Sequence, residues 1–191
     1  TAATRAGWGG AQLLLANAPG VAGLCGAELV AKGPPDGYAE LVSAAGEMSM
    51  NVTLFRKMPY DPSGDFQPVT LAATTPVILV AHPSRPVKSV QQLIALAKAQ
   101  PGKLSFASSG AGSSTHLSSE LFKSMAGIDL LHVPYKGSSQ ALIDLMAGRV
   151  SMIFVNMPSA LPFIKDGRVR ALGVSGSKRS HGLPDLLAIA G

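Results

Sequence analysis

The sequence predicts an α/β fold. Short apolar runs of strand length alternate with stretches of helical period, and several helical stretches end at a glycine. From residue 103 to residue 175 the pattern is regular, with strand, helix, strand, helix, strand, helix and strand in that order. This order is typical of a parallel sheet with right-handed crossovers. The 191 residues suffice for one domain or two small ones.

The N-terminal part of the chain is less regular. We expect strands at residues 12–17 and 38–45, and one or two extended segments within 66–83. Between the first two strands, a glycine-rich loop leads to a short helix that ends near Gly33. Residues 58–66 contain two prolines and a glycine among acidic residues, so they are expected to form a turn.

The clearest helix signal begins at Ser89. Gln92 follows it by three residues, which is the spacing of a capping box, and Pro101 with Gly102 ends the helix. The apolar positions of this segment share one helical face: Val90, Leu93, Ile94 and Ala97.

The remaining elements follow the alternating pattern. Strands are predicted at residues 103–108, 128–135, 149–156 and 168–176. Helices are predicted at 115–127, 138–148 and 158–167, each ending in a glycine. The first of these helices is expected to bury Leu117, Leu121, Phe122 and Met125, and the second Leu142, Leu145 and Met146.

The composition excludes several classes of protein. Hydrophobic residues make up 47% of the chain and charged residues 14%, which is typical of a protein with a buried core. The net charge of +5 is scattered and aromatic residues are only 5%, so no nucleic-acid surface is expected. No apolar run reaches the length of a membrane span. Cys25 is the only cysteine, so no internal disulfide is expected.

Three polar loops follow strands of the predicted parallel sheet and open helices. They are Ser108–His116, Tyr135–Ser139 and Asn156–Ser159. Ligands of open parallel sheets bind beyond the carboxyl ends of the strands, and helix starts offer unpaired N–H groups with positive partial charge. Such loops suit an anion, particularly a carboxylate. Lys136 could add a full charge, and hydroxyls could add donors from Ser109, Ser113, Ser114, Thr115, Ser138 and Ser139.

Other kinds of site fit these loops less well. The segment GAGSST lacks the lysine of a nucleotide phosphate loop and the G-x-S-x-G pattern of a hydrolase elbow. A serine esterase-like hydrolase that uses Ser113 or Ser114 with His116 stays as an alternative, although no acidic partner is evident. The histidines are isolated, so no metal site is predicted.

Several stretches in a fixed order resemble the Bug/TctC family of extracytoplasmic solute-binding proteins of tripartite tricarboxylate transporters. Among them are YDPSGDFQPVTLAATTPVILVAHP, SFASSGAGSSTHLSSELF, HVPYKG and IKDGRVRALGV, and the resemblance covers roughly residues 10 to 189. It implies a periplasmic binding fold of type II, with two α/β domains around a ligand cleft. It also implies capture of a small carboxylate (a di- or tricarboxylate, an amino acid or an aromatic acid) for a membrane permease, without catalysis or a cofactor.

The resemblance also implies a domain division. The first domain would comprise residues 1–80 and 172–191, and the second residues 81–171. Segments near LVAHP and ALGVSG would form the hinge. The protein would be periplasmic, and the start at Thr1 fits a mature or trimmed chain. A ligand sensor or scaffold of the same fold, not coupled to transport, is an alternative.

The ligand-binding residues expected from the polar loops and from the resemblance together come from five regions of the chain. They are Ser43, Ala44, Thr74, Thr75, Ser108, Ser109, Gly110, Ser113, Ser114, Thr115, His116, Tyr135, Lys136, Gly137, Ser138 and Asn156.

The chain also departs from the family pattern. Val155 stands where the family usually has aspartate, and Ala18 stands where it usually has arginine. The first domain is expected to be truncated at both ends: either the chain is a fragment, or a homodimer or a domain swap covers the surfaces this leaves.

Overall fold

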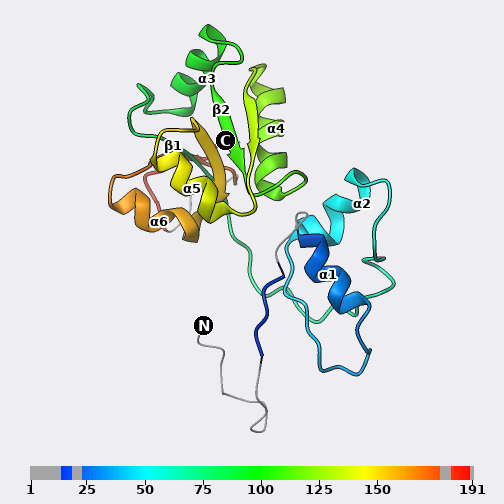
Figure 1. The fold of residues 1–191 in the computed structure, drawn as a ribbon. Helices are drawn as coiled ribbons and strands as arrows, with labels where there is room; N and C mark the ends of the chain where they lie inside the picture. Colours follow the sequence, from blue (N-terminus) through cyan, green and yellow to red (C-terminus); the bar gives the residue numbers. More distant parts are fainter. Residues whose placement is uncertain (1–13, 19–22, 177–181, 190–191) are drawn as a thin grey trace.

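The computed structural model describes residues 14–18, 23–176 and 182–189. Figure 1 shows a larger lobe built on a β-sheet and a smaller lobe that contains α1 and α2. Residues 67–76 run between the two lobes without helix or strand. No helix within the described residues combines the length and the apolar composition needed to cross a membrane.

The larger lobe contains a five-stranded sheet with the order β3-β2-β4-β1-β5. The strands are β1 (Val77–Ala81), β2 (Ser105–Ser108), β3 (Leu131–Pro134), β4 (Met152–Asn156) and β5 (Arg170–Val174). β2 runs parallel to β3 and β4, whereas β1 lies antiparallel to both β4 and β5. The parallel arrangement predicted for residues 103–175 is therefore confirmed, with the earlier strand β1 inserted antiparallel between the last two.

Local signals account for the helices that connect these strands. They are α3 (Val90–Ala99), α4 (Ser114–Ala126), α5 (Ser138–Met146) and α6 (Met157–Lys165). The Ser89 side chain accepts the Gln92 N–H and caps α3, while the Gln92 side chain accepts the Lys88 N–H, one residue before the cap. Gly127 adopts a left-handed conformation and ends α4, as predicted.

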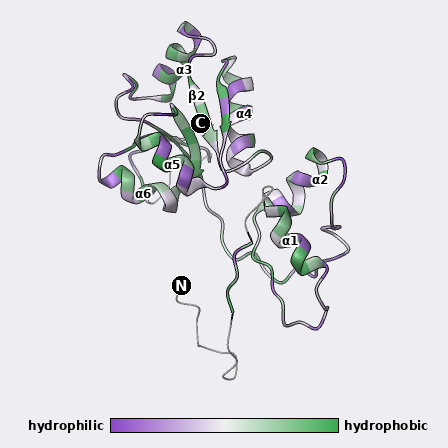
Figure 2. Ribbon diagram, viewed as in Figure 1, coloured by the Kyte–Doolittle hydropathy of each residue, from purple (hydrophilic) through white to green (hydrophobic). Residues whose placement is uncertain are grey.

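Helices cover both faces of the sheet and bury two separate hydrophobic clusters. Leu93 of α3 and Phe122 of α4 pack with Phe106 on one face. Leu142 and Leu145 of α5 and Ala160 of α6 pack on the other. In Figure 2 the strands are mostly hydrophobic, whereas the helices carry both hydrophobic and hydrophilic residues. Because both faces of the sheet are covered, the polar groups at the strand ends are left as candidates for a site.

The predicted buried face of α4 is wrong in part. Leu121 and Met125 are 62% and 76% exposed, whereas Thr115, Ser119 and Phe122 are buried. The Phe122 ring meets the Phe154 ring edge-on at 5.8 Å, which orients the helix over β4. The buried stripe therefore includes two polar residues. The Thr115 hydroxyl bonds the adjoining loop, and the Ser119 hydroxyl donates to the Thr115 carbonyl within the helix.

Within its described residues, the smaller lobe consists of short helices joined by segments without regular structure. It contains α1 (Leu24–Ala31), a π-helical turn η2 (Gly46–Met50) and α2 (Asn51–Leu54), and its core is Leu24, Ala27 and Tyr60. The strand expected at 38–45 is absent. Residues 14–17 of the strand expected at 12–17 are not in a strand either, and residues 12 and 13 lie outside the described residues. Leu14, Tyr38 and Val42 are each more than 80% exposed, whereas Leu41 is partly buried and packs against the core of the smaller lobe.

The domain division at 80/81 and 171/172 stays a prediction. Boundaries at 80/81 and 171/172 cut through β1 and β5, and the two expected hinge segments pair with each other inside the sheet. Residues 182–189 also join the larger lobe, because the Val174 N–H donates to the Leu187 carbonyl and the Ile189 N–H donates to the Val174 carbonyl. We propose that the larger lobe comprises residues 77–176 and 182–189, with residues 67–76 as a linker.

Candidate functional site

A cavity of about 210 Å³ lies where the smaller lobe meets the ends of β2 and β4. This is below the range of roughly 300–1,000 Å³ that is usual for drug-sized ligands, so the cavity suits a small molecule. The smaller lobe contributes Gly23, Ala44, Gly46 and Glu47, and the larger lobe Ser109, Ser113, Ser114, Thr115, Ser138 and Asn156. These residues come from the starts of four helices, α1, α4, α5 and α6, from the loop before α4 and from the π-helical turn η2 with the residues before it.

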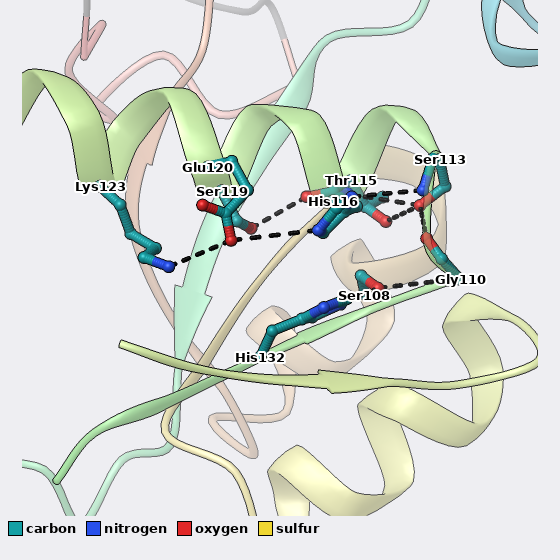
Figure 3. Close-up of polar contacts among 10 residues, drawn as sticks. Ser108, Gly110, Ser113, Thr115, His116, Ser119, Glu120, Lys123 and His132 are labelled. Atoms are coloured by element: carbon teal, nitrogen blue, oxygen red, sulfur yellow. Dashed lines mark hydrogen bonds and ion pairs between the residues drawn. The ribbon is translucent and has the colours of Figure 1, made fainter. Parts of the chain in front are cut away.

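The loop before α4 is held by hydrogen bonds within itself (Figure 3). The Ser113 hydroxyl donates to the Gly110 carbonyl at 2.7 Å and accepts the His116 N–H at 3.3 Å, which caps the helix. The Thr115 hydroxyl oxygen accepts the Ser109 N–H at 2.9 Å. It also lies within 3.0 Å of the Ser109 and Ser113 hydroxyls. These bonds fix the shape of the cavity wall before any ligand arrives.

Other polar groups in the cavity have no internal partner. Within the described residues, the side chains of Ser114, Ser138 and Asn156 make no hydrogen bond to the protein. Ser138 begins α5, and Asn156 is the N-cap position of α6. Hydroxyl and amide groups in such positions are free to donate to an anion, and the positive ends of the helix dipoles add to the attraction.

His116 lies behind the cavity wall rather than in it. Its ring stacks on His132 with the centroids 4.3 Å apart, and His132 stacks on Phe106 at 4.7 Å. The Gly112 N–H donates to Nδ1 of His116, so this nitrogen is an acceptor. His132 Nε2 lies 2.7 Å from the buried Ser108 hydroxyl. Burial, together with the neighbouring His116 and Lys123, lowers the pKa of His132 against the opposing pull of Glu120.

The cavity itself does not provide a serine–histidine pair, because the Ser108–His132 contact is buried beneath the loop. Within the described residues, neither ring nitrogen of His116 is hydrogen-bonded to Ser113 or Ser114, and the contact with Ser113 runs through the backbone N–H. The described residues also hold no group of three or more His, Cys, Asp or Glu side chains able to bind a metal ion. The site therefore offers hydrogen-bond donors in a fixed geometry without an activated nucleophile.

The loop before α5 contributes less than predicted. Lys136 is exposed and does not line the cavity, and Gly137 serves as the N-cap of α5. The Tyr135 hydroxyl donates to Asp144 at 2.8 Å, and burial together with this bond raises the pKa of Tyr135 to about 12. The same bond, with Arg149, lowers the pKa of Asp144. Tyr135 thus fastens the loop to α5 from outside the cavity.

The structure brings seven of the sixteen predicted residues to the cavity: Ala44, Ser109, Ser113, Ser114, Thr115, Ser138 and Asn156. It places the others elsewhere: Ser43, Thr74, Thr75, Ser108, Gly110, His116, Tyr135, Lys136 and Gly137. Ser43, Thr74 and Thr75 are exposed, and Ser108 is buried beneath the loop. Whether the seven bind a ligand stays a prediction.

Sequence reasoning missed three lining residues, Gly23, Gly46 and Glu47. The only available signal was their position, since Gly46 and Glu47 follow the predicted Ala44 by two and three residues. Val155, which replaces the family's usual aspartate, is buried in the cluster under α5 and α6. Its side chain is part of the core and does not reach the cavity.

A larger hollow of about 600 Å³ lies elsewhere on the larger lobe. It is formed by the start of α3 and residues 185–189, together with Ala171 and Leu172. None of the predicted site residues lines it. The chemistry expected from the sequence therefore gathers at the smaller cavity between the lobes.

Comparison with known proteins agrees with this fold. The chain is 43% identical over 181 residues to a UPF0065 protein from the tcbD-tcbE intergenic region of Pseudomonas sp. strain P51, covering 95% of this chain and 54% of that one. An R. palustris protein solved with adipate matches with a TM-score of 0.85 and 42% identity, covering 88% of this chain and 56% of that one. MatC from Rhodopseudomonas palustris, solved with bound malate, matches with a TM-score of 0.82 and 31% identity, covering 88% and 57%.

The chain thus spans about half the length of the curated relatives it matches. The model of the tripartite tricarboxylate transporter family receptors, TctC, matches residues 7–191. Nearly the whole chain is matched, and the open sheet with its covering helices has the architecture of the solved relatives. The chain therefore belongs to the TctC family of tripartite tricarboxylate transporter receptors.

Proposed function

We propose that this protein binds a small carboxylate in the cavity between its lobes and delivers it to a membrane permease of the tripartite tricarboxylate type. The observation that carries this proposal is the set of free donors at three helix starts, Ser114, Ser138 and Asn156. Neutral donors and helix dipoles stabilise a carboxylate without a basic side chain. Adipate and malate in the solved relatives support the same ligand class.

We also infer a periplasmic location and a binding role without catalysis. Support for the location comes from a solved relative described as a periplasmic transporter, with a TM-score of 0.87. The binding role is supported because, within the described residues, neither Ser113 nor Ser114 is hydrogen-bonded to a ring nitrogen of His116. The homodimer or domain swap stays a prediction.

Isothermal titration against a panel of mono-, di- and tricarboxylates tests the ligand class. We expect heat with at least one member and none with the corresponding amides, because only the anion is attracted by the helix dipoles. No heat with any carboxylate would contradict the proposal. A chromogenic ester should give no burst release, since none of the serines that line the cavity is hydrogen-bonded to a histidine ring nitrogen of the described residues.

The Ser138→Ala variant tests the site itself. We expect a loss of about 1.5–3 kcal/mol in binding free energy, the range for a hydrogen bond to a charged group. Ser139→Ala is the matched control, because Ser139 is the next residue of α5, is exposed and does not line the cavity. Equal affinities in the two variants would move the binding site away from α5.

A further inference from the structure

The cavity contains one charged side chain, and its charge is negative. Glu47 is the only Asp, Glu, Lys or Arg among the residues that line the cavity within the described part of the chain. Every other lining side chain is neutral, so a ligand with two carboxylates would place one of them near a like charge. At close range in a partly enclosed site, like charges disfavour binding.

The Glu47 carboxylate is held in place by the smaller lobe. Its Oε2 accepts the Ala44 N–H at 3.0 Å, and the Glu47 carbonyl accepts the Tyr60 hydroxyl at 2.8 Å. Gly23 lies so close to the carboxylate that any side chain at position 23 would collide with it. The carboxylate therefore occupies space that only a glycine leaves open, beside the cavity.

The charge of Glu47 is not neutralised by the protein. Within the described residues, Glu47 forms no ion pair with a lysine, arginine or histidine, whereas Glu28 and Asp144 each have a cationic partner. The Glu47 charge also acts on Tyr60, because burial and this charge together raise the pKa of the Tyr60 hydroxyl. An uncompensated carboxylate at a ligand cavity attracts a cationic group on the ligand.

We propose that the site selects a carboxylate that also carries a protonated amine. The carboxylate of the ligand would meet the free donors of Ser114, Ser138 and Asn156, and its ammonium group would pair with Glu47 on the facing wall. This inference rests on the proposed function and deepens it, because it names the second group of the ligand. Glu47 is then the residue that separates amino acids from dicarboxylates of the same length.

The test compares ligands that differ only in the charge of one end. Isothermal titration is run with butanedioate against 4-aminobutanoate, and with hexanedioate against 6-aminohexanoate. In at least one pair we expect the amino acid to bind at least about tenfold more tightly, which corresponds to ~1.4 kcal/mol. Glu47→Gln should remove or reverse this preference, since the amide oxygen can still accept the Ala44 N–H while the charge is gone.

Glu40→Gln is the matched control. Glu40 lies in the same lobe, is exposed and does not line the cavity, so its substitution changes the net charge equally without touching the ligand. We expect it to keep the native preference. Circular dichroism and thermal unfolding of both variants establish that they are folded as the native protein is.

The outcomes separate this inference from the proposed function. Tighter binding of the dicarboxylates, unchanged in Glu47→Gln, would overturn the role of Glu47 and leave carboxylate capture standing. A preference for the amino acids that persists in Glu47→Gln would assign the selection to another group and also overturn it. Failure of all four ligands and of the wider carboxylate panel would overturn both.

Discussion

At the scale of single residues, the stack of Phe106, His132 and His116 supports the wall of the cavity. The two histidine rings lie 24° from parallel, and each imidazole is tied to the loop, His132 through Ser108 and His116 through Gly112. Because the pKa of His132 is lowered mainly by burial, protonation of this ring works against the folded state. The loop that carries Ser109 to Thr115 is thus coupled to the charge of a histidine behind it.

A pH dependence of stability follows from His132. The unfolded chain takes up the proton near the ordinary value of 6.5, whereas the folded protein takes it up only at lower pH. Between these two values the unfolded state binds more protons, so the free energy of unfolding rises with pH. We expect stability to be constant near pH 7.5 and to fall as the pH is lowered below 6.5 toward the lowered pKa of the folded protein, measured by urea denaturation at several pH values.

Two substitutions identify His132 as the source of that slope. His132→Gln should flatten the curve near pH 6.5, because the group that titrates is gone. His82→Gln should leave the slope in place, since His82 lies outside the ring stack and contacts Ser84 instead. An equal slope in the native protein and in His132→Gln would show that another group is responsible.

At the scale of elements, the packing of α4 determines the position of Ser114 and of the loop before this helix. Phe122 anchors the helix against Phe154, while Leu121, one position earlier, is 62% exposed. We expect Phe122→Ala to lower the free energy of unfolding by about 3–5 kcal/mol, the usual cost of removing a buried aromatic ring. Leu121→Ala should change it by no more than about 0.5 kcal/mol. Urea denaturation measures the free energy of unfolding of both variants. Similar losses would mean that Leu121 is buried, as the sequence predicted.

The elements that the sequence predicted correctly depend on local chemistry. The Ser89 cap, the left-handed Gly127 and the apolar face of α3 act within a few residues, and they appear in the structure as predicted. The strands expected at 12–17 and 38–45 failed because a strand needs a neighbour to pair with. The antiparallel β1 could not be predicted for the same reason, since its partners lie 71 to 96 residues further along the chain.

The candidate site also contains residues that local sequence predicts and one that it does not. Ser109 to Thr115, Ser138 and Asn156 were predictable, because each opens a helix after a strand of the parallel sheet. Glu47 belongs to a π-helical turn in the other lobe, and nothing local in the sequence relates that turn to the α4 loop. Its place in the cavity follows only from how the two lobes meet.

At the scale of the whole molecule, the lobes meet at Gly112. This glycine has φ +83°, and a Cβ atom there would lie 3.1 Å from Asn51 Oδ1, 3.4 Å from Leu54 Cδ1 and 3.5 Å from Phe55 Cε2. Asn51 and Leu54 belong to α2, and Phe55 follows it directly, whereas Gly112 lies in the loop before α4. The absence of a side chain at Gly112 therefore sets how closely the two walls of the cavity approach.

Gly112→Ala should separate the walls and weaken ligand binding. An alanine with positive φ costs about 1–2 kcal/mol in stability wherever it lies. At position 112 the new methyl group would also press on the smaller lobe. Gly127→Ala is the control, because Gly127 also has positive φ at +59° and nothing lies within 4 Å of its Cβ position. Both variants should lose stability, whereas a lower carboxylate affinity by titration is expected for Gly112→Ala alone. Equal losses of affinity in the two variants would mean that backbone strain at the two ends of α4, and not the contact between the lobes, governs binding.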